Sequence, residues 1–467
     1  MLFRSSPTSA CCINRAASPA PGTRQRSRMI PVAEAVEKIR AAMTPTEAQV
    51  VPLSEALGRV LAADVTARVS QPPVDVSAMD GYAVRAADVA GATRGSPVRL
   101  RVGGRVGAGM VADRPVGTGE AWRVLTGAPI PPGADAVVPF EWVRAVSPNG
   151  QATSEVPSGF GGWTGAIDEV EELAIDVTAA VDAGDDIRAR GEDQRAGTVA
   201  IRAGTRIRPA EVAVLASLGR RWVWATRRVR IGVLSTGDEL VGRDLTGPLP
   251  PGLIRDANAP GLMAMVERDG AEPMDLGQVP DQATAIRDAF IFAVQGACDA
   301  IISSGGVSMG DRDMVRHVVQ GDGEITIWSI DLRPGKPFAF GSFRGVPIFG
   351  LPGNPVSALV TYELLVAPAV RRIQGEVATG LVEVPAVTEV ALVNDSGREQ
   401  FMRGVARTFH DAGGVVSWHV RPTGPQGSGI LSSMSRANCL IRLPATTTSV
   451  PAGGAVTLSL PGVPSLW

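Results

Sequence analysis

The sequence has few of the residues that build thiolate or imidazole sites. It contains 4 cysteines and 3 histidines in 467 residues, with no CxxC pair and no HExxH-like motif. These absences argue against a disulfide framework, a thiolate zinc site and a Ser–His–Asp triad. Carboxylates must then carry any metal or proton chemistry, and a reducing cytoplasm is the expected location.

The sequence also lacks a large excess of positive or negative charge, and it lacks long hydrophobic runs. The formal net charge is −2, which gives no overall attraction to nucleic acid or to an anionic membrane. The apolar runs are far shorter than the ~20 residues that span a bilayer. The chain is 45% hydrophobic and 20% charged, a balance typical of soluble globular proteins, and its length predicts about two to four domains.

Lysine is replaced by arginine almost everywhere, and Lys38 and Lys336 are the only lysines. Codon usage accounts for this bias in general. A lysine that persists inside a Gly/Pro loop is still a functional candidate, because lysine and arginine are not interchangeable at tight sites. In the segment DLRPGKP, a stiff loop holds Arg333 and Lys336 close together, which suits a dianion. A solvated turn is the alternative.

The N-terminal part of the chain predicts little folded structure before Ile30. Residues 1–28 are rich in Arg, Ser, Ala and Pro and contain no acid, which indicates a disordered tail or a start placed upstream of Met29. Apolar spacing predicts a helix from Ile30 and a second helix at 57–61. The Gly- and Pro-rich region that follows predicts a small all-β domain, with a flexible insertion at 147–168.

From Arg227 onwards strands and helices alternate. Apolar strands are predicted at 229–234, 299–303 and 346–349, each followed by a Gly-rich loop and a helix. This repetition predicts a parallel α/β sheet, in which ligands bind beyond the carboxyl ends of the strands. After Gly375, short strands and turns predict a terminal β-barrel or sandwich.

The loop SSGGVSMGDRD follows the second of these strands and precedes a helix. Gly305 and Gly306 expose backbone N–H groups there, and the helix dipole adds positive potential. Ser303, Ser304 and Ser308 supply hydroxyl donors. The segment therefore predicts a phosphate-binding loop, although a tight turn alone would also explain the two glycines.

Asp281 and Asp313 each precede a predicted helix at the ligand edge of the sheet. Helix capping is one explanation. The other is metal binding, since two carboxylates ~4 Å apart repel by ~4 kcal/mol at an effective dielectric near 20, and Mg²⁺ with phosphate oxygens relieves that repulsion. Patterning alone favours capping.

Three further segments look structural when they are judged from the residues alone. In FGLPGNPVSA, Asn354 is a natural N-cap and Pro355 occupies the first helical position. STGDEL places Asp238 and Glu239 at the end of a strand, and Asp80 lies in the turn-rich segment VDVSAMDGYAV. Acids beside glycine in turns usually form Asx turns. Judged from the residues alone, these positions therefore have a structural role in turns and at a helix start.

Taken together, the motifs resemble those of the molybdopterin molybdenumtransferase family, MoeA and the gephyrin E domain. The matching segments follow the family's order along the chain. They are SAMDGYAV (77–84), TGAPIPPGADAVV (126–138), RARGEDQRAG (188–197), STGDEL (235–240), SSGGVSMGDRD (303–313), RPGKPFAFG (333–341) and GLPGNPVSA (350–358). Beyond Gly375 the match is looser, through 397–407 and 424–443.

The resemblance implies an elongated, multi-domain subunit that forms a homodimer. Its fold would combine an α/β molybdopterin-binding domain with a parallel sheet, a small β domain inserted after N-terminal helices, and a C-terminal β-barrel. Mapped onto this chain, the domains are 29–68 with 190–226 (helical or linker), 69–189 (inserted β), 227–375 (α/β) and 376–467 (C-terminal β).

The resemblance also implies a reaction, in which adenylylated molybdopterin and molybdate, with Mg²⁺, give molybdenum cofactor and AMP. Site residues are carried over only where the motifs match. The implied catalytic residues are Asp80, Thr126, Glu239, Asp281 and Asp313, the last two also binding Mg²⁺. The implied substrate-binding residues are Ser304, Gly305, Gly306, Ser308, Pro337, Pro352, Gly353, Asn354 and Pro355 around the pterin phosphate, and Arg333, Lys336, Ser357, Arg403 and Ser428 for molybdate.

Alternatives and departures accompany this assignment. An adenylyltransferase acting one step earlier shares the α/β domain, and a gephyrin-like scaffold would keep the fold without the reaction. The adenylyltransferase and cofactor-insertion chaperones are the implied protein partners. Ser329 stands where some family members have a basic residue, and the 147–168 insertion is longer than usual. Molybdate and tungstate are tetrahedral dianions that the sequence does not distinguish.

Overall fold

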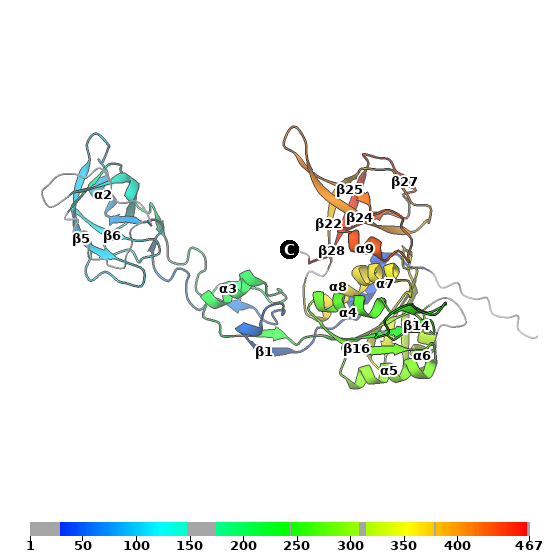
Figure 1. Cartoon of the computed structure of the whole chain (residues 1–467). Coiled ribbons are helices and arrows are strands. Elements are labelled where there is room, and N and C mark those ends of the chain that lie inside the picture. The colour runs from blue at the N-terminus through cyan, green and yellow to red at the C-terminus, as the bar shows by residue number, and fades with distance from the viewer. Residues whose placement is uncertain (1–28, 147–173, 243, 308–313, 378–379, 465–467) are drawn as a thin grey trace, which may run out of the picture. The chain divides into compact units, whose positions relative to one another are not determined.

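The computed structural model describes residues 29–146, 174–242, 244–307, 314–377 and 380–464. The insertion expected at 147–168 and the loop residues Ser308 and Asp313 lie outside these ranges. The chain divides into two compact units (Figure 1). Unit 1 comprises Met1–Thr46, Arg228–Gln374 and Ala378–Trp467, and unit 2 comprises Glu47–Arg227 with Gly375–Val377. None of the described helices is both long and apolar enough to cross a membrane.

A six-stranded sheet forms the centre of unit 1, in the order β16-β13-β17-β21-β20-β18. Its strands are β13 (Arg230–Thr236), β16 (Glu272–Val279), β17 (Ala300–Ser304), β18 (Gly323–Ser329), β20 (Pro337–Phe343) and β21 (Val346–Leu351). The first four strands in the spatial order are parallel to one another. Strand β20 pairs antiparallel with both of its neighbours, β21 and β18. The predicted parallel α/β sheet is therefore confirmed for β13, β17 and β21, and extended by an antiparallel edge.

Helices cover both faces of this sheet, as Figure 1 shows. They are α1 (Val32–Ala42), α4 (Asn258–Arg268), α5 (Ala283–Gln295), α6 (Met314–Asp322), α7 (Pro355–Thr361), the π-helix η3 (Tyr362–Val366) and α8 (Ala367–Ile373). Helices α5 and α6 pack on one face and α1, α4, α7 and α8 on the other. Burying side chains such as Ile286 and Phe290 of α5, both 0% exposed, stabilises the fold by roughly 2 kcal/mol each.

Helix α1 belongs to the α/β core of unit 1. Its side chains Val32, Ala35 and Ile39 are buried and pack in the same cluster as the central strands. The sequence instead predicts a discontinuous helical or linker domain of residues 29–68 and 190–226. The apolar stripe of the helix was recognised, but a stripe alone does not identify the surface that covers it.

The C-terminal part of unit 1 is a closed β-barrel. Strand pairing runs β24-β25-β22-β28-β26 and returns from β26 to β24, and short β19 pairs with the outer side of β24. The strands are β19 (Leu332–Arg333), β22 (Leu381–Thr388), β24 (Glu399–His410), β25 (Val416–Pro422), β26 (Cys439–Leu443) and β28 (Ala455–Pro464), with the small pair β23 (Leu392–Val393) and β27 (Ser449–Val450) and helix α9 (Ser432–Arg436). This closure confirms the predicted barrel.

Unit 2 contains a curled six-stranded sheet and a set of short elements. The sheet order is β7-β4-β6-β5-β9-β8. Its strands are β4 (Gly81–Val84), β5 (Val98–Val106), β6 (Glu120–Val124), β7 (Ala136–Pro139), β8 (Val143–Val146) and β9 (Ala174–Val177), with helix α2 (Ala86–Val89) and the 3-10 turn η2 (Phe140–Trp142). The predicted all-β domain is thereby confirmed.

The remaining elements of unit 2 surround the point where the chain enters and leaves it. They are β1 (Ala48–Pro52), η1 (Leu53–Glu55), β2 (Val65–Thr66), β3 (Val76–Ser77), β10 (Ile187–Arg188), β11 (Val199–Ile201), α3 (Pro209–Ser217) and β12 (Trp222–Thr226). Antiparallel pairing joins β1 to β12. The second helix predicted at 57–61 is wrong: Val60 and Leu61 instead form isolated β-bridges with Arg206 and Ala225. Tertiary pairing overrides the weak helical spacing there.

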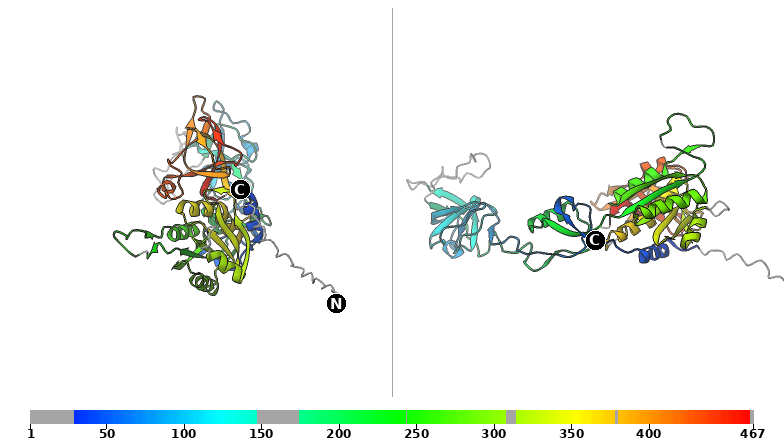
Figure 2. Two further views of the ribbon diagram at one scale, coloured as in Figure 1. Left: turned by 90° about the vertical axis from the view of Figure 1, so that its right-hand side faces the viewer. Right: turned by 90° about the horizontal axis from the view of Figure 1, so that it is seen from below.

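Two short strands leave the sheet of unit 1 after β13. These strands, β14 (Leu240–Val241) and β15 (Ile254–Arg255), pair in parallel. Figure 2 shows this segment projecting from the body of unit 1. It returns at the N-terminus of α4, so residues on both of its arms border the carboxyl edge of the sheet.

Candidate active site

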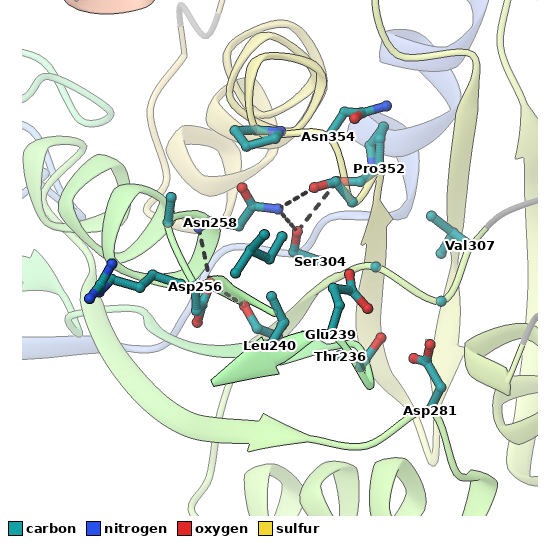
Figure 3. Close-up of a pocket in the computed structure, with 18 of the residues that line it drawn as sticks. Thr236, Glu239, Leu240, Asp256, Asn258, Asp281, Ser304, Val307, Pro352 and Asn354 are labelled. Atoms are coloured by element: carbon teal, nitrogen blue, oxygen red, sulfur yellow. Dashed lines mark hydrogen bonds between the residues drawn. The ribbon is translucent and has the colours of Figure 1, made fainter. Parts of the chain in front are cut away.

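A cavity of about 420 Å³ opens at the carboxyl edge of the parallel strands. Its walls come from the loops that follow β13, β17 and β21, together with the β14–β15 segment and the start of α4. This is the place where α/β sheets bind ligands. Figure 3 shows Glu239, Asp281 and Thr236 on one side of the cavity, and Asn258, Ser304 and Pro352 on the other.

Gly305 and Gly306 form the loop after β17, and both have a left-handed backbone, with φ of 94° and 65°. A Cβ atom at Gly305 would lie 2.4 Å from the carbonyl oxygen of Thr236, so only glycine permits this close approach. Within the described residues, the N–H groups of Gly306 and Asn354 donate to no protein acceptor. Both residues line the cavity, where their N–H groups can bind an anion.

The acidic residues Glu239 and Asp281 line the cavity. Glu239 follows β13, and Asp281 follows β16 and donates its backbone N–H to the Asp238 carboxylate at 3.1 Å. The N-cap of α5 is Gln282, with no side-chain cap hydrogen bond. Asp281 therefore lies one residue before the N-cap of α5, and it belongs to the wall of the cavity.

A cluster of three or more metal-binding side chains does not occur among the described residues. Asp281 supplies one carboxylate to the cavity, and Asp313, its expected partner, lies outside the described ranges. Such a sparse set of protein ligands is compatible with Mg²⁺, which keeps several waters and binds through one or two carboxylates plus substrate phosphate.

A polar network that the sequence did not reveal crosses the cavity floor. The amide of Asn258 donates to Ser304 Oγ (2.8 Å) and to the carbonyl oxygen of Gly353 (2.7 Å). Ser304 Oγ in turn donates to the carbonyl oxygen of Pro352 at 3.3 Å. The single hydroxyl proton of Ser304 is therefore already used within the protein. An anion at this loop would therefore meet backbone N–H groups and not the hydroxyl proton of Ser304.

The loop with Arg333 and Lys336 is held by glycine at its centre. Gly335 has φ of 121°, and a Cβ there would lie 2.4 Å from Thr361 Oγ1. The guanidinium of Arg333 forms an ion pair with Asp395 and keeps the pKa of that carboxyl below its usual range. Pro337 lines the cavity, whereas Arg333 and Lys336 are not part of its wall.

Arg403 lies inside the C-terminal barrel region rather than at the cavity. It is 1% exposed and donates to Ser433 Oγ and to the carbonyl oxygens of Gln426 and Gly427. Burial lowers the pKa of Arg403 to about 10. The next residue, Ser428, accepts a hydrogen bond through its carbonyl from the N–H of Val356 in α7 (3.1 Å). The buried arginine thus fixes a loop that contacts α7.

Asp80 and Thr126, two further predicted site residues, lie in unit 2 and contact each other. The Asp80 carboxylate accepts hydrogen bonds from the backbone N–H (2.7 Å) and the hydroxyl (2.9 Å) of Thr126. Asp80 directly precedes β4 and Thr126 follows β6, and these strands pair. Two residues distant in sequence are therefore brought into contact by the sheet, in a partly exposed position.

Three family models match the chain in succession. They describe the MoeA N-terminal region (domain I and II, residues 30–219), a probable molybdopterin binding domain (residues 232–372) and the MoeA C-terminal region (domain IV, residues 385–460). The second of these contains all the residues that line the cavity.

Similar proteins match over nearly their whole length. Molybdopterin molybdenumtransferase of Haemophilus influenzae is 36% identical over 417 residues, which is 89% of this chain and 94% of that protein. The Bacillus subtilis protein of the same name is 34% identical, over 92% and 94% respectively. A crystal structure of the molybdopterin biosynthesis MoeA protein from Pyrococcus horikoshii is 29% identical, with a TM-score of 0.72, and covers 93% of this chain and 100% of that one. The chain therefore belongs to the molybdopterin molybdenumtransferase family.

Proposed function

We propose that this chain is a transferase that inserts molybdenum into adenylylated molybdopterin and releases AMP in a Mg²⁺-dependent step. The observation that carries the proposal is the cavity at the sheet edge, where the Gly305–Gly306 loop and the carboxylates of Glu239 and Asp281 meet. A phosphorylated pterin and a charged anhydride require both kinds of group. The full-length match to molybdenumtransferases supports the same reaction.

The geometry of two loops supports a proposal of phosphate binding. The N–H groups of Gly306 and Asn354, two residues that line the cavity, have no acceptor among the described residues. Their dipoles stabilise negative charge without reorganisation. We infer that these groups hold the pterin phosphate, while the small glycine at 305 lets the backbone approach it.

The carboxylate of Asp281, together with that of Asp313, would hold Mg²⁺. When bound, the ion supplies positive charge that stabilises the leaving phosphate of AMP. Glu239 faces the same side of the cavity (Figure 3) and is positioned to orient a water or a molybdate oxygen. Asp80 and Thr126, in unit 2, are the two other proposed catalytic residues.

Molybdate is a tetrahedral dianion and requires cations and hydroxyl donors. Arg333, Lys336, Ser357, Arg403 and Ser428 are the candidates. Of the two arginines, Arg333 and Arg403, Arg333 is the more exposed, with 45% of its side chain accessible to solvent. Arg403 is 1% exposed, so its role in binding would be to fix the loop that carries Ser428. Tungstate has the same shape and charge and is the competing substrate.

We further propose that the protein works in the cytoplasm as a homodimer. The described cysteines, Cys298 and Cys439, are buried free thiols, which suits a reducing compartment. Analytical ultracentrifugation of the purified chain tests the dimer, and a monomer at micromolar concentration would reject it. The preceding adenylyltransferase and cofactor-insertion chaperones are the partners that this position in the pathway implies.

The reaction is tested with protein starting at Met29, adenylylated molybdopterin, molybdate and Mg²⁺, by following AMP chromatographically. Molybdate-dependent AMP release is the expected result. Asp281→Asn should lower the rate at least about 100-fold and raise the Mg²⁺ concentration needed for half-maximal rate. Asp288→Asn, an exposed aspartate on α5, is the matched control and should retain full activity.

Two other outcomes would favour the alternatives. Formation of the adenylate from ATP and molybdopterin, without AMP release from it, would make the chain an adenylyltransferase. The matches to MoeA N- and C-terminal regions on both sides of the shared α/β domain argue against this. Absence of both reactions would leave a scaffold that keeps the fold alone.

A further inference from the structure

A single side-chain amide connects the loops that form the cavity. Asn258, the first residue of α4, uses one Nδ2 hydrogen for Ser304 at the end of β17 and the other for the carbonyl of Gly353 before α7. The orientation of the amide is fixed by chemistry, because a carbonyl oxygen can only accept a hydrogen bond. Asn258 therefore joins two loops that are far apart in the sequence.

Asn258 is itself held in place from the opposite side. Asp256 Oδ1 accepts hydrogen bonds from the backbone N–H groups of Asn258 (3.0 Å) and Ala259 (3.1 Å). It also accepts from Ser235 Oγ on β13, at 3.0 Å. Asp256 is 7% exposed, so this carboxylate is a buried anchor. The ends of β13 and β17 and the start of α7 are thus linked through Asp256 and Asn258.

We propose that Asn258 is a positioning residue for the insertion reaction, which aligns the backbone donors that bind the substrate's phosphate. The C=O and N–H of a trans peptide point in opposite directions. Anchoring the carbonyl of Gly353 therefore also fixes the N–H of Asn354, which lines the cavity and has no acceptor among the described residues. This inference rests on the proposed function and adds a residue that its motif-based site does not contain.

The position of Ser304 follows from the same amide. Ser304 is 2% exposed, receives a hydrogen bond from Asn258 and donates to Pro352. The Gly305–Gly306 loop begins at the next residue. A Cβ placed on Gly353 would lie only 3.7 Å from Gly305 Cα, so the two loops are in contact. Movement of one loop is therefore transmitted directly to the other.

Removal of the amide should loosen both loops while leaving the catalytic carboxylates intact. Asn258→Ala is expected to raise the dissociation constant for molybdopterin and the KM for its adenylate by about tenfold to a hundredfold, the range for two lost hydrogen bonds. The maximal rate of AMP release should fall less than threefold. Binding is measured by quenching of pterin fluorescence and turnover by AMP chromatography.

A same-size substitution makes the test specific. Asn258→Asp places a carboxylate oxygen against the Gly353 carbonyl, where no donor remains, so binding at neutral pH should be weaker than in the alanine variant. Protonation of the new carboxyl restores a donor. Binding by Asn258→Asp should therefore recover relative to wild type as the pH is lowered, whereas Asn258→Ala should show no such recovery.

Asn438→Ala is the matched control for stability. The Asn438 amide bridges the backbone N–H (2.7 Å) and carbonyl (2.8 Å) of Ala406 in the barrel, so its loss also removes two hydrogen bonds. Unchanged KM and molybdopterin affinity in Asn258→Ala, with a fall in melting temperature like that of Asn438→Ala, would overturn the proposal. If wild type binds molybdopterin but releases no AMP, the insertion reaction fails, while weaker binding by Asn258→Ala still supports the positioning role.

Discussion

The carboxylate of Asp80 is held twice by Thr126, through the backbone N–H at 2.7 Å and the hydroxyl at 2.9 Å. The hydrogen bond from the backbone N–H remains when the threonine side chain is replaced by that of any residue except proline. The hydroxyl can therefore be removed while the aspartate stays in position. This separation allows the contributions of the two residues to be measured independently.

Thr126→Val should lower molybdate-dependent AMP release by about threefold, the effect of one lost hydrogen bond. If Asp80 acts as we propose, Asp80→Ala should lower the rate about 100-fold, because the proposed catalytic carboxylate is removed. Thr118→Val, which deletes a hydroxyl bound by Arg85 in the same unit, should have no effect. Equal losses for Thr126→Val and Asp80→Ala would instead show that the threonine hydroxyl acts on the substrate directly.

Gly305→Ala should disrupt the loop after β17. The added methyl would lie 2.4 Å from the Thr236 carbonyl, on a residue with φ of 94°. We expect unit 1 to lose about 1–3 kcal/mol of stability and molybdopterin binding to be lost with it. Gly321→Ala in α6, where the new methyl meets open space, should be neutral or stabilising by up to about 1 kcal/mol. Urea unfolding and pterin fluorescence measure both effects.

Asp395→Asn should strengthen molybdate binding. In the structure the Asp395 carboxylate forms an ion pair with the guanidinium of Arg333. Molybdate must displace this carboxylate in order to bind to Arg333. Both side chains are exposed to solvent, and exposed ion pairs are weak, so the gain in affinity should be no more than about fivefold. Calorimetric titration with molybdate at low salt measures the change. The same substitution in an Arg333→Ala background should have no effect, and a gain there would contradict the explanation.

Arg99 and Asp176 lie opposite each other on β5 and β9 and share two hydrogen bonds, of 2.7 and 2.9 Å. This hydrogen-bonded pairing lowers the pKa of Asp176. The resulting stabilisation is complete above the unfolded aspartate value of about 3.9 and is lost as the pH falls through the lowered folded value. Arg99→Met should raise the pKa of Asp176 in carboxyl-carbon NMR titrations and weaken this acid dependence. Arg202→Met, at an exposed arginine of the same unit, should do neither.

The strands that carry the cavity could be predicted because their sequences are continuous apolar runs. In β13 and β17 nearly every residue is buried, which is typical of a sheet covered on both faces. The edge strands β16 and β18 are largely exposed or half-buried and lack this pattern. Their sequences were therefore not recognised as strands.

Asn258 could not be found from the sequence. The segment IRDAN resembles an ordinary helix start, with an acid and an amide near the first turn. Its partners lie 46 and 95 residues away, and no local rule connects them. Arg403 illustrates the opposite case: the family motif identified it, but only the structure reveals that it is buried and bound to backbone carbonyls.

The pairing of β1 with β12 has a consequence for how this chain could be rebuilt. Glu47 and Arg227, the first and last residues of the long segment of unit 2, share a backbone hydrogen bond of 2.8 Å and an ion pair of 2.7 Å. These contacts hold the two ends of the segment together. The entropic cost of closing a loop rises only slowly with the length of the loop. Evolution or an engineer can therefore lengthen, shorten or exchange the inserted module without changing the strand order of the central sheet of unit 1.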